Sequence, residues 1–191
     1  MPGLPEVWVF FGLIASGKSY LARAWAKRHG FVHLNSDQLR KELAGAAAGS
    51  GRGASADQGI YTPEFSRRTY DELLARAGVA LAGGRSVLLD ASYQSRAERD
   101  RVRAWAAGQG VAVHFVQCIC PEEEVKRRLQ LRAGDPGAVS DGRWEILQLQ
   151  KNRFEPPAEL AGSQLLTLAT DRPLGELLDQ LDKIFEVTDH V

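Results

Sequence analysis

The chain has 191 residues, the size of one compact domain, and 44% of them are hydrophobic and 25% charged, as in ordinary globular proteins. Basic and acidic residues number 24 each, so the formal net charge is zero and gives no global attraction to a polyanion or an anionic membrane. No apolar run is long enough to span a membrane, the N-terminus lacks a signal peptide pattern, and the two cysteines, Cys118 and Cys120, are expected to be reduced. We therefore expect a single cytoplasmic domain over residues 1–191.

Apolar runs and helical periodicities alternate from the start of the chain. The run Val7–Phe11 predicts a buried strand, a glycine-rich turn follows, and Lys18–His29 has helical spacing. A second strand is expected at residues 31–34. Ser36 is expected to cap a helix over residues 37–43.

The middle of the chain begins with a stretch rich in glycine, alanine and serine. Residues 45–59 predict a flexible loop. Thr62 is expected to cap a helix that has Pro63 at its first position and ends near Ala82. The alternation then continues, with strands expected at 86–89, 111–119 and 164–169 and helices at 96–107, 122–132, 140–151 and 174–187.

Strict alternation of strands and helices is typical of an α/β protein with a parallel sheet and helices on both faces. In such a sheet, ligands bind beyond the carboxyl ends of the strands. Residues that follow the predicted strands are therefore the first candidates for a functional site.

Residues 12–19 read GLIASGKS and match GxxxxGK[ST] between a predicted strand and a predicted helix. The two glycines allow a tight turn, and successive backbone N–H groups form an anion-binding nest at a helix N-terminus. The lysine can reach the β- and γ-phosphates of a nucleotide, and the serine hydroxyl can bind Mg²⁺. The pattern favours a phosphate-binding loop over a chance glycine turn, and the expected nucleotide contacts are Gly12, Leu13, Ile14, Ala15, Ser16, Gly17, Lys18, Ser19 and Tyr20.

Two aspartates follow predicted strands. If the strand that Asp90 ends neighbours the first strand, its carboxylate lies beside Ser19, where it holds Mg²⁺ through water or binds the substrate; otherwise Asp90 caps the next helix. Asp37 would face the γ-phosphate and accept the proton of an attacking hydroxyl, or it is a helix N-terminal acid that the helix dipole stabilises. Arg40, one turn later on the same face, would bind the acceptor or lie solvated on the surface.

A basic segment lies near residue 130. Arg128 and Arg132 are i and i+4 on a predicted helix and project the same way. Arginines that reach a moving phosphoryl group from a closing segment stabilise its charge. The alternative is a solvated basic helix face.

The loop GLIASGKS, the segment NSDQLRKEL, the strand end LLDAS, the segment RRLQLR and Ser140-Asp141 together resemble the P-loop kinase superfamily. The similarity runs from Val7 to about Glu186 and is greatest to kinases like phage polynucleotide kinase, chloramphenicol phosphotransferase, gluconate kinase and zeta toxin. It implies a three-layer αβα fold with five parallel strands in the order 2-3-1-4-5, a helical lid at about 127–142 and a variable acceptor side at about 45–84.

The resemblance also implies roles for single residues, with ATP and Mg²⁺ as cofactors. Asp37 matches the general base and Arg40 the arginine that holds the acceptor. Arg128 and Arg132 match lid arginines, and the second would also stack on adenine. The turn after the last strand matches the region that contacts the base, which adds Asp171, Arg172 and Pro173 to the expected nucleotide contacts.

Three functions are compatible with this pattern. The first is a kinase acting on a hydroxyl of a small molecule, and the second is a 5′-hydroxyl polynucleotide kinase, which needs a basic channel. The third is a switch that hydrolyses ATP slowly and has no acceptor; Asp37 argues against it. The candidate channel residues are Arg52, Arg67, Arg68, Arg96, Arg99, Arg101 and Arg103, interspersed with Asp57, Glu64, Glu98 and Asp100.

Overall fold

The computed structural model describes residues 4–48, 62–133, 144–160 and 164–188. Five short strands form one parallel sheet in the order β2-β3-β1-β4-β5, which confirms the predicted fold class and strand order. The strands are β1 (Val7–Phe11), β2 (Val32–Asn35), β3 (Val87–Asp90), β4 (Val113–Ile119) and β5 (Leu165–Ala169).

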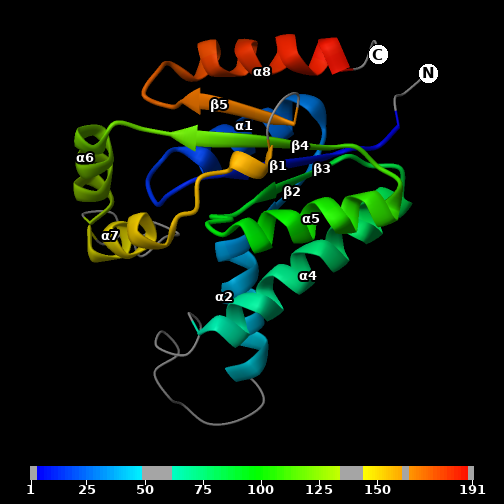
Figure 1. Cartoon of the computed structure of the whole chain (residues 1–191), viewed down its shortest axis with the longest axis horizontal. Helices are drawn as coiled ribbons and strands as arrows, with labels where there is room; N and C mark the ends of the chain where they lie inside the picture. Colours follow the sequence, from blue (N-terminus) through cyan, green and yellow to red (C-terminus); the bar gives the residue numbers. More distant parts are fainter. Residues whose placement is uncertain (1–3, 49–61, 134–143, 161–163, 189–191) are drawn as a thin grey trace.

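Helices cover both faces of the sheet (Figure 1). One apolar cluster joins α1 and α8 to one face, and a second joins α4 and α5 to the other, while α6 and α7 lie at the carboxyl ends of the strands. Within the described residues, no helix is long and apolar enough to cross a lipid bilayer. The helices are α1 (Lys18–His29), α2 (Ser36–Ala48), α4 (Pro63–Ala82), α5 (Arg96–Gln109), α6 (Glu122–Ala133), α7 (Trp144–Arg153) and α8 (Leu174–Thr188), with the short 3₁₀ helix η1 (Ala158–Leu160).

The central strand β1 is buried at every position, since helices cover both of its faces. This is why its sequence is a continuous apolar run without alternation. Phe10 is paired in register with Asp90 of β3, and Asp90 with Asn35 of β2. The register therefore brings the ends of three strands together at one edge of the sheet.

The predicted cap of α2 was wrong by one residue. Asn35, not Ser36, caps the helix, because its Oδ1 accepts hydrogen bonds from the backbone N–H groups of Asp37 and Gln38 at 3.1 and 2.9 Å. Ser36 is instead the first helical residue and is buried. An asparagine at a strand end followed by serine offers two possible caps, and the strand register decides between them.

Helix α2 is also longer than predicted, since it runs to Ala48 rather than residue 43. The first residues of the predicted loop, Gly45–Ala48, are therefore helical, because three alanines outweigh the low helix propensity of one glycine. The rest of that loop lies outside the described residues. Farther on, the predicted cap Thr62 is confirmed, because its Oγ1 accepts from the Phe65 N–H at 3.2 Å.

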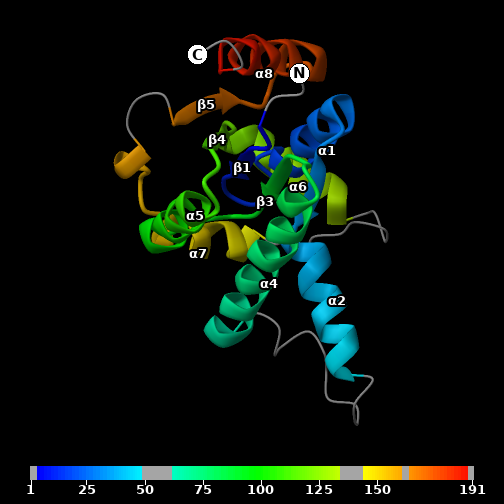
Figure 2. The same cartoon turned by 90° about the vertical axis from the view of Figure 1, so that its right-hand side faces the viewer.

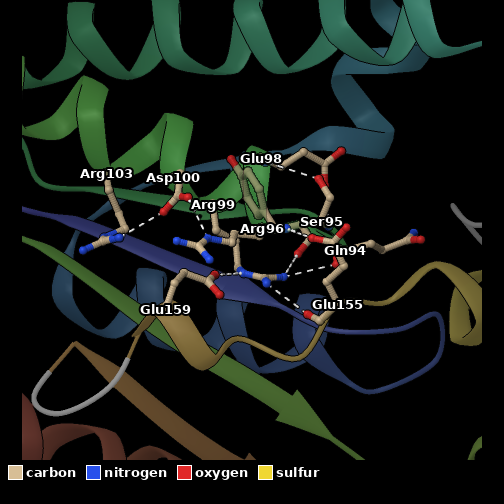
Figure 3. Close-up of polar contacts among 10 residues, drawn as sticks. Gln94, Ser95, Arg96, Glu98, Arg99, Asp100, Arg103, Glu155 and Glu159 are labelled. Atoms are coloured by element: carbon tan, nitrogen blue, oxygen red, sulfur yellow. Dashed lines mark hydrogen bonds and ion pairs between the residues drawn. The ribbon is translucent and has the colours of Figure 1, made fainter.

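A fully buried arginine joins α5 to the chain that follows α7 (Figure 3). Arg99 forms an ion pair with Glu159, whose side chain is 4% exposed. Its guanidinium also donates hydrogen bonds to the backbone carbonyl oxygens of Tyr93 at 2.9 Å, Gln94 at 3.2 Å and Glu155 at 2.9 Å. Arg99 therefore ties the loop after β3 to the segment that leads into β5, and it is not available for a surface channel.

Candidate active site

The two glycines that bracket the phosphate loop are required by close packing. At Gly12 (φ +147°), a Cβ would overlap the carbonyl oxygen of Cys118 on β4. Gly17 is the N-cap of α1 and has φ +84°, and a Cβ there would lie 2.8 Å from Nη1 of Arg128. The loop is thus pressed against β4 on one side and α6 on the other.

Between these glycines the loop is held in shape by α6 and α7. Ala15 is buried and adopts the left-handed conformation, with φ +57°, although it is not glycine. The Ile14 N–H donates to Oε1 of Gln150 on α7 at 2.7 Å. The loop also shares an apolar cluster with both helices, formed by Ile14, Ala15, Val125, Leu129 and Leu147.

The structure places Asp90 beside Ser19, where the adjacency of β3 and β1 predicts it. The Ser19 hydroxyl donates to Asp90 Oδ1 at 3.0 Å. Lys18 starts α1, and its ammonium lies 3.4 Å from the carbonyl oxygen of Leu13, back over the loop. The alternative role of Asp90 as a helix cap was wrong, since Ser95 caps α5.

Two residues of β2 complete the surroundings of Asp90. Its Oδ2 accepts from the amide of Asn35 at 2.6 Å and lies 3.2 Å from Nε2 of His33. Burial alone would raise the pKa of Asp90, but the hydrogen bonds from His33 and Asn35 and the charge of Lys18 lower it below its usual value. Asp90 is therefore a buried, ionised carboxylate.

His33 and Asn35 were not predicted from the sequence as residues of the site. His33 and Asn35 are two apart on β2 and so point to the same face of the sheet, as does Asp90 in register with Asn35. The alternation of polar residues along β2 was the available signal, but it has meaning only once β2 is placed beside β3.

The pair Ser19 and Asp90 fits Mg²⁺ of the kind that nucleotides carry. Mg²⁺ keeps several waters and takes one or two carboxylates together with substrate phosphates, so a hydroxyl and one carboxylate are sufficient from the protein. Within the described residues, no group of three or more His, Cys, Asp or Glu side chains could hold a metal ion. The described donors therefore suit a metal that arrives with the nucleotide.

Helix α2 presents the expected acceptor-side residues. Asp37 lies in its first turn, two residues beyond the end of β2, and its partly exposed carboxylate makes no hydrogen bond or ion pair with the described residues. Arg40 is only 8% exposed, donates to the hydroxyl of Ser66 on α4 at 3.2 Å and lies over the ring of Phe65. A solvated surface position for Arg40 is therefore wrong.

Arg128 on α6 is bound to the phosphate loop rather than solvated. Its Nη1 donates to the carbonyl oxygen of Ala15 at 3.3 Å, its Nη2 donates to that of Thr170 at 2.7 Å, and its Nε pairs with Glu124 at 2.8 Å. The hydroxyl of Thr170 in turn donates to the carbonyl oxygen of Ser16. The turn between β5 and α8 is thus joined to the loop.

The other expected nucleotide contacts lie around this junction. Asp171, Arg172 and Pro173 follow Thr170 and are exposed, and Tyr20 is 68% exposed on α1. Arg132 belongs to α6, but its side chain lies outside the described part of the structure, as do Ser140-Asp141 and the predicted lid beyond residue 133.

A family model described as an AAA domain matches residues 7–157. The chain belongs to the AAA domain family. Among curated proteins, this AAA domain is 29% identical over 119 residues to uncharacterized proteins of Mycobacterium tuberculosis strain H37Rv and Mycobacterium bovis. The matched region is 62% of this chain and only 24% of those relatives, so the chain spans about a quarter of their length.

Solved structures share the fold of this AAA domain. A sugar kinase from Janibacter sp. HTCC2649 is 20% identical with a TM-score of 0.68, and 97% of each chain is covered. The APS kinase of Mycobacterium tuberculosis, in complex with AMPPNP and APS, is 20% identical with a TM-score of 0.67 over 97% of this chain and 99% of that chain. A gluconokinase from Sinorhizobium meliloti 1021 is 21% identical with a TM-score of 0.62, over 100% and 96%.

At these identities the likeness shows the fold, and the suspected fold of the P-loop kinase superfamily is confirmed. The fold supports a nucleotide-dependent kinase in general terms. The acceptor has to be argued from the residues of this chain.

Proposed function

We propose that this AAA domain is an ATP-dependent kinase that transfers the γ-phosphate to a hydroxyl of a small molecule. The observation that carries the proposal is the contrast between two carboxylates at one edge of the sheet. Asp90 is buried and bonded to Ser19, Asn35 and His33, while Asp37 is partly exposed and bonded to none of the described residues. One suits a metal site and the other suits proton transfer.

The proposed roles follow from these positions. The loop N–H groups and Lys18 bind the phosphates, and Ser19 and Asp90 would hold Mg²⁺, which neutralises phosphate charge when bound. Asp37 accepts the proton of the attacking hydroxyl, and Arg40 orients the acceptor. Arg128 and Arg132 stabilise the charge of the moving phosphoryl group. Nucleotide contacts are proposed for Tyr20, Arg132, Asp171, Arg172 and Pro173 in addition to residues 12–19.

The surface around α4 and α5 favours a small acceptor over a polynucleotide. Arg99 is buried, Arg96 and Arg103 both pair with Asp100, and Arg101 pairs with Asp71. Four of the seven candidate channel arginines are thus buried or neutralised, which argues against the positive groove that a nucleic acid backbone requires.

The state of the cysteines suits the proposed cytoplasmic location. Cys118 and Cys120 are free thiols, as expected in a reducing compartment. Burial raises the pKa of the Cys118 thiol to about 12, so it is an unreactive core residue beneath the phosphate loop.

To test the proposal, the protein is incubated with ATP, Mg²⁺ and each member of a panel of hydroxyl acceptors, and the release of ADP is measured. We expect Lys18→Ala to abolish turnover, and Asp37→Asn to keep ATP binding but to lower acceptor-dependent turnover by about 10²–10⁴-fold. Asp179→Asn, an exposed aspartate of α8, is the matched control with unchanged turnover. ADP release that no acceptor stimulates would refute the kinase assignment. Full activity of Asp37→Asn would refute the general-base role of Asp37.

A further inference from the structure

A cavity of about 300 Å³ lies between α4 and α5. Figure 2 shows α4 between α5 and α2, so the cavity and the catalytic residues of α2 flank the same helix. The volume is at the lower end of the range for small-molecule sites, which suits a ligand of about one ring. Its polar lining comes from Ser66, Arg67, Tyr70, Tyr93, Glu98 and Arg101.

The lining of this cavity includes a buried tyrosine, Tyr93. Tyr93 is 1% exposed, and its Oη is buried and has no hydrogen-bond partner among the described residues. Buried polar groups in native proteins nearly always have a partner, so an unpaired one calls for an explanation. Tyr70 does not supply it, because its own hydroxyl is 3.2 Å from the hydroxyl of Ser92. A ligand hydroxyl in the cavity would satisfy Tyr93.

The backbone holds Tyr93 in this position against its own preference. Tyr93 has φ +40°, which is uncommon for a bulky residue. Arg99 donates to its carbonyl oxygen at 2.9 Å, and the ring of Tyr70 lies 5.0 Å from its ring, centroid to centroid. Strained conformations that the surroundings enforce concentrate at ligand sites. The phenol is thus positioned by two neighbouring elements.

The charges around the cavity balance one another. Glu98 uses Oε2 to accept from the Ser95 N–H at 3.2 Å, and within the described residues its other oxygen makes no hydrogen bond. Arg67 has no ion pair among those residues, whereas Arg101 pairs with Asp71. Arg67 and Glu98 contribute one charge of each sign, so the lining has no net charge to attract a cation or an anion. A neutral molecule with several hydroxyls can donate to Glu98 and accept from Arg67.

The cavity is connected to the proposed catalytic residues by hydrogen bonds. Ser66 on its wall accepts from Arg40 at 3.2 Å. Tyr70 reaches Ser92, whose carbonyl oxygen accepts from the N–H of Gly12 at 3.4 Å. The cavity therefore adjoins both the start of the phosphate loop and the arginine expected to hold the acceptor.

We propose that this cavity is the acceptor pocket and that the acceptor is an uncharged, polyhydroxylated ring such as a neutral monosaccharide or a cyclitol. This inference rests on the proposed kinase activity. A ring hydroxyl oxygen forms a bond to the γ-phosphorus as the bond from that phosphorus to the β,γ-bridging oxygen breaks. The hydroxyl proton passes to Asp37, and ADP leaves with the electron pair of the broken bond.

Binding is measured by calorimetry with the full chain, Mg²⁺ and a non-hydrolysable ATP analogue. ADP release is measured with the full chain, Mg²⁺ and ATP. The probes are neutral aldohexoses, aldopentoses and cyclitols, each matched with the corresponding acid and amino sugar. We expect a neutral ring to bind at least 10-fold more tightly than its charged counterparts. Tyr93→Phe and Glu98→Gln should each weaken its binding about 10-fold, with unchanged binding of the ATP analogue. Glu72→Gln, on the exposed face of α4, is the matched control.

The outcomes separate the pocket from the kinase activity. If no neutral ring binds, or a charged analogue binds more tightly, the acceptor class is wrong. If a neutral ring is phosphorylated equally well by Tyr93→Phe, Glu98→Gln and the unmodified chain, the pocket is wrong and the kinase assignment stands. If binding depends on both residues but ADP is not released, the pocket stands and the kinase assignment fails.

Discussion

Replacement of Arg99 by methionine is expected to destabilise the protein by about 4 kcal/mol. The substitution removes one partner of a buried ion pair and leaves the carboxylate of Glu159, 4% exposed, without its counter-charge. Breaking such a pair costs about 3–5 kcal/mol. Three carbonyl oxygens also lose a donor, each worth about 1 kcal/mol, but these contributions overlap with the first because all four partners share one guanidinium.

Urea unfolding followed by circular dichroism measures this loss, and the thermal midpoint should fall by roughly 8–16 °C in a chain of this length. The control is Arg76→Met. Arg76 is exposed on α4 and pairs with Glu42 and Glu72, so its loss should cost less than about 1 kcal/mol. Adding Glu159→Met to Arg99→Met should recover part of the stability by removing the stranded charge. A loss in Arg99→Met no larger than that in Arg76→Met would refute the reasoning.

Three further predictions concern the loop, the metal and pH. Gly12→Ala should lower the free energy of unfolding in urea by about 3 kcal/mol, because the new methyl group meets the backbone of β4. Gly108→Ala in α5, where the added methyl group has open space, should raise it by about 0.5–1 kcal/mol. Equal effects of the two substitutions would contradict the packing argument. Mg²⁺ alone should leave the thermal midpoint unchanged, while Mg²⁺ with ATP at 100 times its Kd should stabilise the protein by about 2.7 kcal/mol. The stabilisation should be smaller in Ser19→Ala. Stabilisation by Mg²⁺ alone would contradict a metal that arrives with the nucleotide. Asp90 and Glu159 have lowered pKa values in the folded state. Their ionised carboxylates therefore contribute to folding stability above the unfolded pKa of about 4, and this contribution is lost as the pH falls through the lowered pKa values. A urea midpoint at pH 3 equal to that at pH 7 would refute this.

The order of elements and the phosphate loop were predictable because their signals are local. A continuous apolar run followed by glycine defines β1, and the bounds of α1 follow from helical spacing that ends at Gly30. The glycines at positions 12 and 17 are required by backbone geometry that the motif itself specifies. These features need no knowledge of which strands are neighbours.

The residues around Asp90 and the cavity could not be predicted because they depend on contacts between distant segments. His33 and Asn35 become partners of Asp90 only through the β2–β3 register. Arg99 lies on a helix crowded with charges, which favours a solvated face, and its burial depends on Glu159, 60 residues later. The position of Tyr93 in turn depends on Arg99.

The left-handed alanine in the phosphate loop has a consequence for how ligands are captured. Holding an L-residue at φ +57° costs roughly 1–2 kcal/mol of backbone energy, and the folded chain already sustains it through the packing of Ala15 against α6 and α7. Packing within the protein therefore holds the loop backbone, and with it the loop amide groups, in this conformation. An incoming phosphate need not order this backbone, so little of the gain from its new hydrogen bonds is lost to conformational entropy.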